Sequence, residues 1–489
     1  MGVAGLTLLA AILRFYRIGH QGYWFDEGNT ALLVHFSLGR MLGLIPQTES
    51  TPPLYYCVAW VWAHVFGYGE AGLRSLSALA GVLTVPVAYG AAAKLVSRRT
   101  GVIVAALCAC NPLLIWYSQE ARSYSLLVLL SALALLGFAY VLEAPTARRV
   151  TLWVLGSALA VATHYYAVVV IAPQAAWLLV RLRREPAVQV GVGVVVLCGL
   201  ALIPLALSQG ATGHDSWIAH SDLGVRLRQI IPQFLIGTDT PARVALKYLA
   251  LALALVGLAW LALRRSAAER RRALLAGGLA LAGFVLSLAF VGAGSDALIT
   301  RNIIGLWLPA AIAVAGGLVL ARPRWLGPGV AAALCAIGIT ASIGIDSDWK
   351  LQRPDWRLAA HVLGARPRDA RARLILIQHY RTLLPLSLYL PHMHYLGPRG
   401  ASGIRELDVV ALRSPQQPLC WWGAACNLIP SQMQSSYAIP GFRVLWRRTV
   451  HQFTIMRLVS STPQTVTPSA VARSLRTTTL PRDELLIQR

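Results

Sequence analysis

Residues 119–142 read QEARSYSLLVLLSALALLGFAYVL, a short charged motif followed by an apolar run that no charged residue interrupts. An α-helix needs roughly 20 such residues to cross a bilayer, and the run at 124–142 is close to that length. Similar apolar runs lie at 1–18, 71–93, 101–117, 150–166, 167–180, 187–207, 243–263, 273–292, 303–320 and 327–345. This pattern predicts an α-helical polytopic membrane protein with about eleven transmembrane helices.

The composition of the whole chain agrees with a membrane protein. Of its 489 residues, 56% are apolar and 13% are charged, and the mean hydropathy is +0.58. A soluble domain is rarely so apolar. The net charge of +24 is spread over many connecting segments, so we expect no nucleic-acid partner and assign the charge to membrane orientation and lipid headgroups.

The segments between the apolar runs alternate between short basic ones and longer ones that carry the acids. The short ones are basic and contain Lys94, Arg98, Arg99, Arg148, Arg149, Arg181, Arg183, Arg184, Arg264, Arg265, Arg270, Arg271, Arg272, Arg322 and Arg324. Because basic connections stay in the cytoplasm, we predict a multi-pass plasma-membrane protein with a cytoplasmic N-terminus and an extracytoplasmic C-terminal region. Arg14 and Arg17 depart from this rule, since they lie at the outer end of the first run.

We predict three parts along the chain. Residues 1–345 form the membrane domain, with a long outside loop at 19–70, and residues 346–460 form an extracytoplasmic α/β domain that includes a helix at 354–363. Residues 461–489 are rich in Ser, Thr, Pro and Arg, which predicts a disordered basic tail. Cys420 and Cys426 form a disulfide in an oxidising compartment or remain two thiols, and the sequence leaves both alternatives open.

Four groups of polar side chains occur at the predicted outer ends of the spans: Asp26 with Glu27, Glu120 with Arg122 and Tyr124, His164 with Tyr165, and Arg301. A carboxylate can act as a general base, and a guanidinium can bind phosphate through its planar fork. Each group also has a structural interpretation, as a helix cap, an ion pair at a turn, a core histidine or a snorkelling arginine. Because all four fall on one predicted face, we favour a site for an anionic lipid headgroup.

An ordered set of motifs resembles the GT-C glycosyltransferases of the protein-mannosyltransferase and aminoarabinose-transferase type. The motifs are Leu13–Gly19, Trp24–Glu27, Pro52–Tyr56, Gln119–Tyr124, Thr163–Tyr165, Arg301 with Pro309, and Asp355–Arg357. The resemblance implies a hexosyl- or pentosyltransferase with the GT-C fold. Such an enzyme transfers a sugar, with inversion, from a polyprenyl-phosphate donor to an extracytoplasmic glycan, lipid or protein.

The resemblance also implies roles for individual residues. Asp26 takes the position of the catalytic acid, as base or acceptor-orienting group, and Glu27 supports it. The donor phosphate is held by positively charged and aromatic residues, namely Arg122, Arg301, Tyr124, Arg14 and Arg17. The resemblance assigns supporting roles to Glu120, His164 and Tyr165.

Some relatives bind a divalent metal ion through a first-loop carboxylate and a histidine from a later outside loop. Glu49 is the nearest carboxylate here, with His214 or His220 as the histidine. The relatives often have histidine immediately before the paired prolines, where this chain has Thr51. Two alternatives therefore stay open: a metal site, or Glu49 as a solvated loop acid.

The main rival interpretation is a transporter or flippase for a lipid-linked sugar. Alternating access needs polar groups near the middle of several spans. The apolar runs here are nearly free of ionisable residues away from their ends. A non-catalytic assembly protein would leave the arginines and acids without a purpose. We therefore favour an enzyme, while the sequence identifies neither the sugar nor the acceptor.

Overall fold

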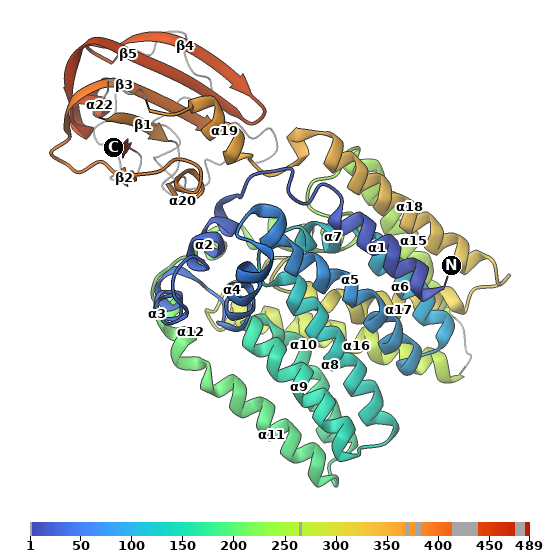
Figure 1. The fold of residues 1–489 in the computed structure, drawn as a ribbon. Helices are drawn as coiled ribbons and strands as arrows, with labels where there is room; N and C mark the ends of the chain where they lie inside the picture. The colour runs from blue at the N-terminus through green and yellow to red at the C-terminus, as the bar shows by residue number, and fades with distance from the viewer. Residues whose placement is uncertain (1, 264–266, 367–371, 378–382, 413–438, 475–484) are drawn as a thin grey trace. The chain divides into compact units, whose positions relative to one another are not determined.

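The computed structural model describes residues 2–263, 267–366, 372–377, 383–412, 439–474 and 485–489, and it contains two compact units (Figure 1). The first unit comprises Met1–Ile18 and Leu33–Ile345. The second comprises Gly19–Leu32 and Asp346–Arg489. The sequence predicted that all of 19–70 is a loop of the membrane domain, whereas the structure assigns its first part to the C-terminal unit.

The first unit is helical. Its helices are α1 (Val3–Phe15), α3 (Leu38–Thr48), α4 (Leu54–Phe66), α5 (Glu70–Leu95), α6 (Arg98–Cys110), α7 (Pro112–Ser118), α8 (Tyr124–Glu143), α9 (Ala147–Thr163), η1 (Tyr165–Ala167), α10 (Val168–Arg181), α11 (Pro186–Ala201), α12 (Ile203–Gly210), α13 (Ser216–His220), α14 (Leu223–Ile236), α15 (Arg243–Leu263), α16 (Ala267–Gly292), η2 (Ile304–Leu306), α17 (Trp307–Val319) and α18 (Leu326–Ser347).

Within the described residues, 6 helices are long and apolar enough to cross a membrane, and the bent pair α6–α7 makes a seventh. The pair bends by 57°, because Asn111 ends α6 and accepts a hydrogen bond from the Leu114 N–H as the cap of α7. The helices α1, α4, η1–α10 and η2–α17 are apolar but shorter. The polytopic helical architecture is confirmed, while the number eleven stays a prediction.

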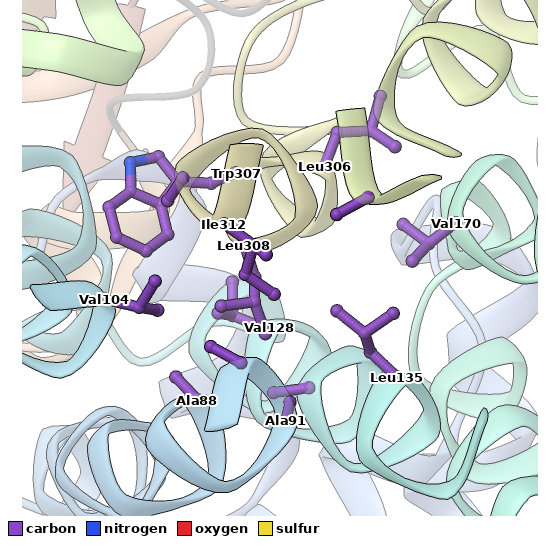
Figure 2. Packing of buried hydrophobic residues seen from close by; sticks show 14 of the residues in the cluster. Ala88, Ala91, Val104, Val128, Leu135, Val170, Leu306, Trp307, Leu308 and Ile312 are labelled. Atoms are coloured by element: carbon purple, nitrogen blue, oxygen red, sulfur yellow. The ribbon is translucent and has the colours of Figure 1, made fainter. Parts of the chain in front are cut away.

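Small residues let the helices of the first unit pack closely. Figure 2 shows part of this core, where Ala88 and Ala91 of α5 lie near Val128 and Leu135 of α8. At the contact between α8 and α9, a Cβ atom on Gly137 would lie only 2.7 Å from the backbone of Trp153. Glycine and alanine at such contacts are typical of membrane helices, which associate by close packing.

The second unit is a mixed sheet with short helices. Its strands are β1 (Arg373–Ile377), β2 (Met393–Tyr395), β3 (Ala401–Leu412), β4 (Arg443–Val450), β5 (Phe453–Val466) and β6 (Leu485–Gln488), in the order β2-β6-β1-β3-β5-β4. Only β1 and β3 pair in parallel among the described strands. Its helices are α2 (Phe25–Leu33), η3 (Trp349–Leu351), α19 (Trp356–Leu363), α20 (Leu383–Ser387) and α22 (Pro468–Ser474). The helix expected at 354–363 is confirmed as α19.

The prediction of a disordered tail over 461–489 is wrong for the part of it that the structure describes. Strand β5 continues to Val466, α22 follows it, and β6 lies between β1 and β2. The reason is the short run Leu485–Ile487, whose side chains are buried. Because the tail is polar on average, its composition did not indicate this short apolar strand. Cys420 and Cys426 lie outside the described residues, so the disulfide stays a prediction.

Four charged side chains form a buried network across β1, β3 and β5. Arg457 Nε lies 2.8 Å from Asp408 Oδ1, and Arg373 Nη1 lies 3.4 Å from both Asp408 Oδ2 and Glu406 Oε1. Arg373 and Asp408 are fully buried. Burial, together with the adjacent Asp408 carboxylate, raises the pKa of Glu406 to about 7.

This raised pKa predicts how the stability of the sheet depends on pH. Glu406 binds its proton more tightly in the folded state than in the unfolded state, so the stability it contributes is fully present below about pH 4.5. That contribution is lost as the pH rises through about 7. We expect amide exchange of β3 and β5 in the full chain to report this loss of stability, and Glu406→Gln to abolish it. A wild-type profile that stays flat between these pH values would contradict the expectation.

Candidate active site

The acidic motif opens α2. The Gly28 N–H donates to Trp24 O at 2.9 Å, so Asp26 and Glu27 lie in the first helical turn. Glu27 Oε2 accepts a hydrogen bond from the Trp24 N–H at 3.4 Å, as the third residue of a capping box does. The structural interpretation therefore accounts for Glu27, which is fully buried.

Asp26 differs from its neighbour in exposure. It is half-buried, and it projects from a different side of α2, because successive helical residues are rotated by about 100°. Of the pair, Asp26 is the more exposed carboxylate.

In the first unit, Glu49 joins two side chains from distant elements. Its Oε2 atom lies 2.8 Å from Arg122 Nη1 and accepts a hydrogen bond from Tyr56 Oη at 2.5 Å. Tyr56 Oη lies 2.9 Å from Thr51 Oγ1 as well. Glu49 follows α3, Tyr56 lies on α4, and Arg122 lies in the turn before α8. With 2% exposure, Glu49 is not the solvated loop acid that one alternative predicted.

Arg301 lies near two aromatic rings. Its Cζ atom is 5.7 Å from the Tyr124 ring centroid and 5.6 Å from that of Trp217. The Tyr124 ring is in turn 5.8 Å from the His164 ring. Arg122 lies in the turn before α8, two residues before Tyr124. Three of the four predicted groups, those that contain Tyr124, His164 and Arg301, thus meet within the first unit.

The supporting residues hold this site together. Tyr165 Oη donates to Gln209 Oε1 at 2.7 Å. Gln209 Nε2 donates to Thr51 O at 3.1 Å and to Ile45 O at 3.3 Å, which fixes the segment that contains Glu49. Glu120 is fully buried, and its carbonyl accepts from the Arg122 N–H at 2.8 Å.

Arg14 and Arg17 lie in different environments. Arg14 is fully buried, and its guanidinium donates to Cys108 O and Ala109 O at 3.0 Å each. These carbonyls belong to the last turn of α6, where the helix dipole is negative and carbonyls lack helical partners. This contact explains why Arg14 departs from the positive-inside rule. Arg17 is exposed, with a positive φ of 52°.

The residues considered for a metal ion have other polar partners. His214 is partly buried and lies 2.8 Å from Thr212 Oγ1, and His220 is exposed and lies 2.7 Å from Ser216 O. The Glu49 carboxylate already pairs with Arg122, whose charge opposes a second cation. Within the described part of the chain, no group of three or more His, Cys, Asp or Glu side chains gathers. The divalent ion therefore stays a prediction, and we derive no step through one.

Sequence reasoning missed several residues of this site. Tyr56 belongs to the Pro52–Tyr56 motif, but the sequence analysis assigned it no role. Trp217 also received no role, although it lies between His214 and His220 in the sequence. Arg226 on α14 and Asp296 in the segment after α16 form an ion pair at 2.6 Å, and its hydrogen bond lowers the pKa of Asp296. Loop positions so far apart share no periodicity that could have revealed these contacts.

Comparisons with known proteins agree with this architecture. The family model described as dolichyl-phosphate-mannose-protein mannosyltransferase matches residues 50–207. ArnT from Cupriavidus metallidurans is similar in structure, with a TM-score of 0.57 in the apo state and 0.56 when bound to undecaprenyl phosphate. In both cases the sequences are 14% identical, and the match covers 93% of this chain and 97% of ArnT.

A second similar structure is the Archaeoglobus fulgidus oligosaccharyltransferase in complex with Zn and sulfate. Its TM-score is 0.46 at 12% identity, and the match covers 79% of this chain and 61% of that protein. No curated protein sequence matches the chain significantly. The ArnT comparison shows that the two proteins share a fold over nearly their whole lengths.

Proposed function

We infer that this chain, which has the GT-C glycosyltransferase fold, is a membrane glycosyltransferase that uses a polyprenyl-phosphate sugar donor. The observation that carries the proposal is the meeting of Tyr124, His164 and Arg301 at the ends of apolar helices in the first unit, with Arg122 two residues before Tyr124. A cationic site there suits a phosphate whose hydrocarbon chain lies in the bilayer. ArnT, of the same fold, binds undecaprenyl phosphate.

The proposed reaction is an inverting displacement. Asp26 removes the proton of an acceptor hydroxyl as its oxygen attacks the anomeric carbon. The new glycosidic bond forms while the bond between that carbon and the phosphate oxygen breaks. The electron pair of the broken bond leaves with the polyprenyl phosphate, whose charge Arg122 and Arg301 stabilise. Glu27 orients α2 through its capping hydrogen bond.

Glu49 sets the position of Arg122 in this scheme. A guanidinium has five N–H donors, so an ion pair with Glu49 is compatible with a phosphate contact. The 2.8 Å contact keeps the planar fork in one orientation, and the Tyr56 hydroxyl holds the carboxylate in turn. Arg122 is therefore pre-organised for a ligand.

We propose that the site faces away from the cytoplasm. The positive-inside rule places the N-terminus in the cytoplasm and the C-terminal unit outside the plasma membrane. The acceptor is an extracytoplasmic glycan, lipid or protein, and the sugar is a hexose or a pentose. We expect no nucleotide-sugar donor on that side of the membrane.

Transfer by purified protein tests the proposal. Proteoliposomes would contain the protein, radiolabelled polyprenyl-phosphate hexoses or pentoses, and extracted envelope acceptors. We expect acceptor-dependent release of free polyprenyl phosphate together with a labelled acceptor. A flippase would instead move the intact lipid-linked sugar between leaflets without cleaving it, and that outcome would overturn the proposal.

Replacement of Arg301 should weaken donor binding. Loss of a charge-assisted hydrogen bond costs about 1.5–3 kcal/mol, so Arg301→Ala should raise the Kd for polyprenyl phosphate by roughly 10–100-fold. Arg301→Lys should recover only part of this affinity, because lysine lacks the planar group that lies near Tyr124 and Trp217. Titration calorimetry in detergent measures both, with Arg322→Ala as the matched control. An unchanged Kd would remove Arg301 from the phosphate site.

A further inference from the structure

We propose that the C-terminal sheet unit positions the proposed catalytic carboxylate through a clamp formed by Asp355, Trp356, Arg357 and Tyr389. This inference rests on the proposed role of Asp26. The clamp residues act through the segment that precedes Asp26, so they are positioning residues. The C-terminal unit then takes part in the reaction, in addition to any contact with an acceptor.

The clamp holds the backbone of residues 19–23. Asp355 Oδ1 accepts from the Gly22 N–H at 3.0 Å, and Tyr389 Oη accepts from the Tyr23 N–H at 2.6 Å. Arg357 Nη2 donates to Gly19 O at 3.1 Å and also to His20 O. Side chains of the sheet unit therefore bond four backbone groups within five consecutive residues.

Asp355 and Arg357 are themselves fixed. The Asp355 carboxylate caps α19 by accepting from the Leu358 N–H at 3.2 Å. Arg357 lies in the first turn of that helix. Because α19 is a regular helix of the sheet unit, its start supplies a rigid frame for both contacts.

Close approach at Gly22 makes the contact specific. A Cβ atom at this position would lie 2.7 Å from the Arg357 Cβ atom and backbone nitrogen. It would also lie 2.8 Å from Asp355 Oδ1. Because backbone atoms cannot yield as a flexible side chain does, any larger residue at 22 must push the segment away from α19.

An aromatic stack continues the clamp up to the acidic motif. The Phe25 ring centroid lies 5.3 Å from that of Trp356, which lies 4.7 Å from that of Phe453 on β5. Trp356 is 1% exposed, so the stack is part of the core. Phe25 directly precedes Asp26 in the first turn of α2, and a shift of this ring would move the carboxylate.

Precise placement matters because a general base must lie within hydrogen-bond reach of the proton it takes. A misplacement of about 1 Å can lower a rate by about 100-fold. The donor phosphate, in contrast, is assigned to Arg122 and Arg301 of the first unit. Loosening the clamp should therefore lower kcat while the KM for the donor stays nearly constant.

The test uses Arg357→Ala and Gly22→Ala in the full-length protein, with Arg399→Ala as an exposed control on the same unit. We expect both clamp variants to lower kcat by about 10–100-fold, with the donor KM within about twofold of wild type. Arg357→Lys keeps a donor and a charge, so it should restore part of the rate. Amide exchange over residues 19–28 should accelerate in both clamp variants and stay unchanged in the control.

The outcomes separate this inference from the proposed function. Faster exchange over 19–28 with kcat within twofold of wild type would overturn the positioning role. Unchanged exchange would show that the clamp does not form. Absence of sugar transfer by the wild-type protein would overturn the proposed function, and the exchange measurement would still decide whether the clamp exists. Thermal unfolding of each variant identifies any variant that fails to fold. In that case Arg357→Lys is compared with the wild-type protein instead.

Discussion

Asp26→Asn is expected to lower the rate of sugar transfer by roughly 10²–10⁴-fold, the contribution of a general base. Asparagine has nearly the shape of aspartate, so α2 should keep its structure, but an amide cannot take up the acceptor proton. The affinity for polyprenyl phosphate should not change, because we assign the phosphate to Arg122 and Arg301. Single-turnover transfer assays and phosphate-lipid titrations on the same preparation measure the two quantities.

Glu27→Gln is the matched control for this prediction. Glutamine also serves as the third residue of a capping box, so the hydrogen bond from the Trp24 N–H should persist. We therefore expect Glu27→Gln to lose less than about tenfold in rate, well below the loss for Asp26→Asn. Transfer by Asp26→Asn at the wild-type rate would remove Asp26 from the mechanism, and an equal loss in both variants would assign the base to the pair.

The membrane fold could be predicted because its signals are local in the sequence. An apolar run such as 124–142 must satisfy its own backbone in lipid, so it forms a helix, and the observed α8 spans Tyr124–Glu143. The polar groups at the ends of the runs could be predicted for the same reason, since lipid excludes charge from the middle. Tyr124, His164 and Arg301 meet in the structure, as this argument implies.

Contacts between distant residues could not be predicted. Gly22 bonds to Asp355, 333 positions later, and no periodicity in either segment indicates the pairing. For Glu49, sequence reasoning left open a metal ligand or a solvated acid, while the structure shows a buried acid paired with Arg122, 73 positions away. Such a pairing depends on how helices pack, which the pattern within one helix does not specify.

Arg122→Gln should strongly destabilise the first unit. The side chain of Glu49 is 1% exposed and that of Arg122 is 10% exposed, so the ion pair is shielded from water. Removing one partner of a buried pair leaves the other charge uncompensated, which costs about 3–5 kcal/mol. We expect the free energy of unfolding in detergent to fall by about this amount, while Lys94→Gln, which breaks a more exposed pair with Glu143, should have a much smaller effect.

The double variant Glu49→Gln/Arg122→Gln separates the charge from the contact. If the cost of Arg122→Gln comes from a stranded carboxylate, then neutralising Glu49 as well should recover most of it, because two neutral amides can bond to each other and to Tyr56. A double-mutant cycle should therefore give a coupling energy of about 2 kcal/mol or more for the pair. Additive single effects would instead mean that Glu49 and Arg122 do not interact. The pre-organisation that we assign to Arg122 would then be wrong.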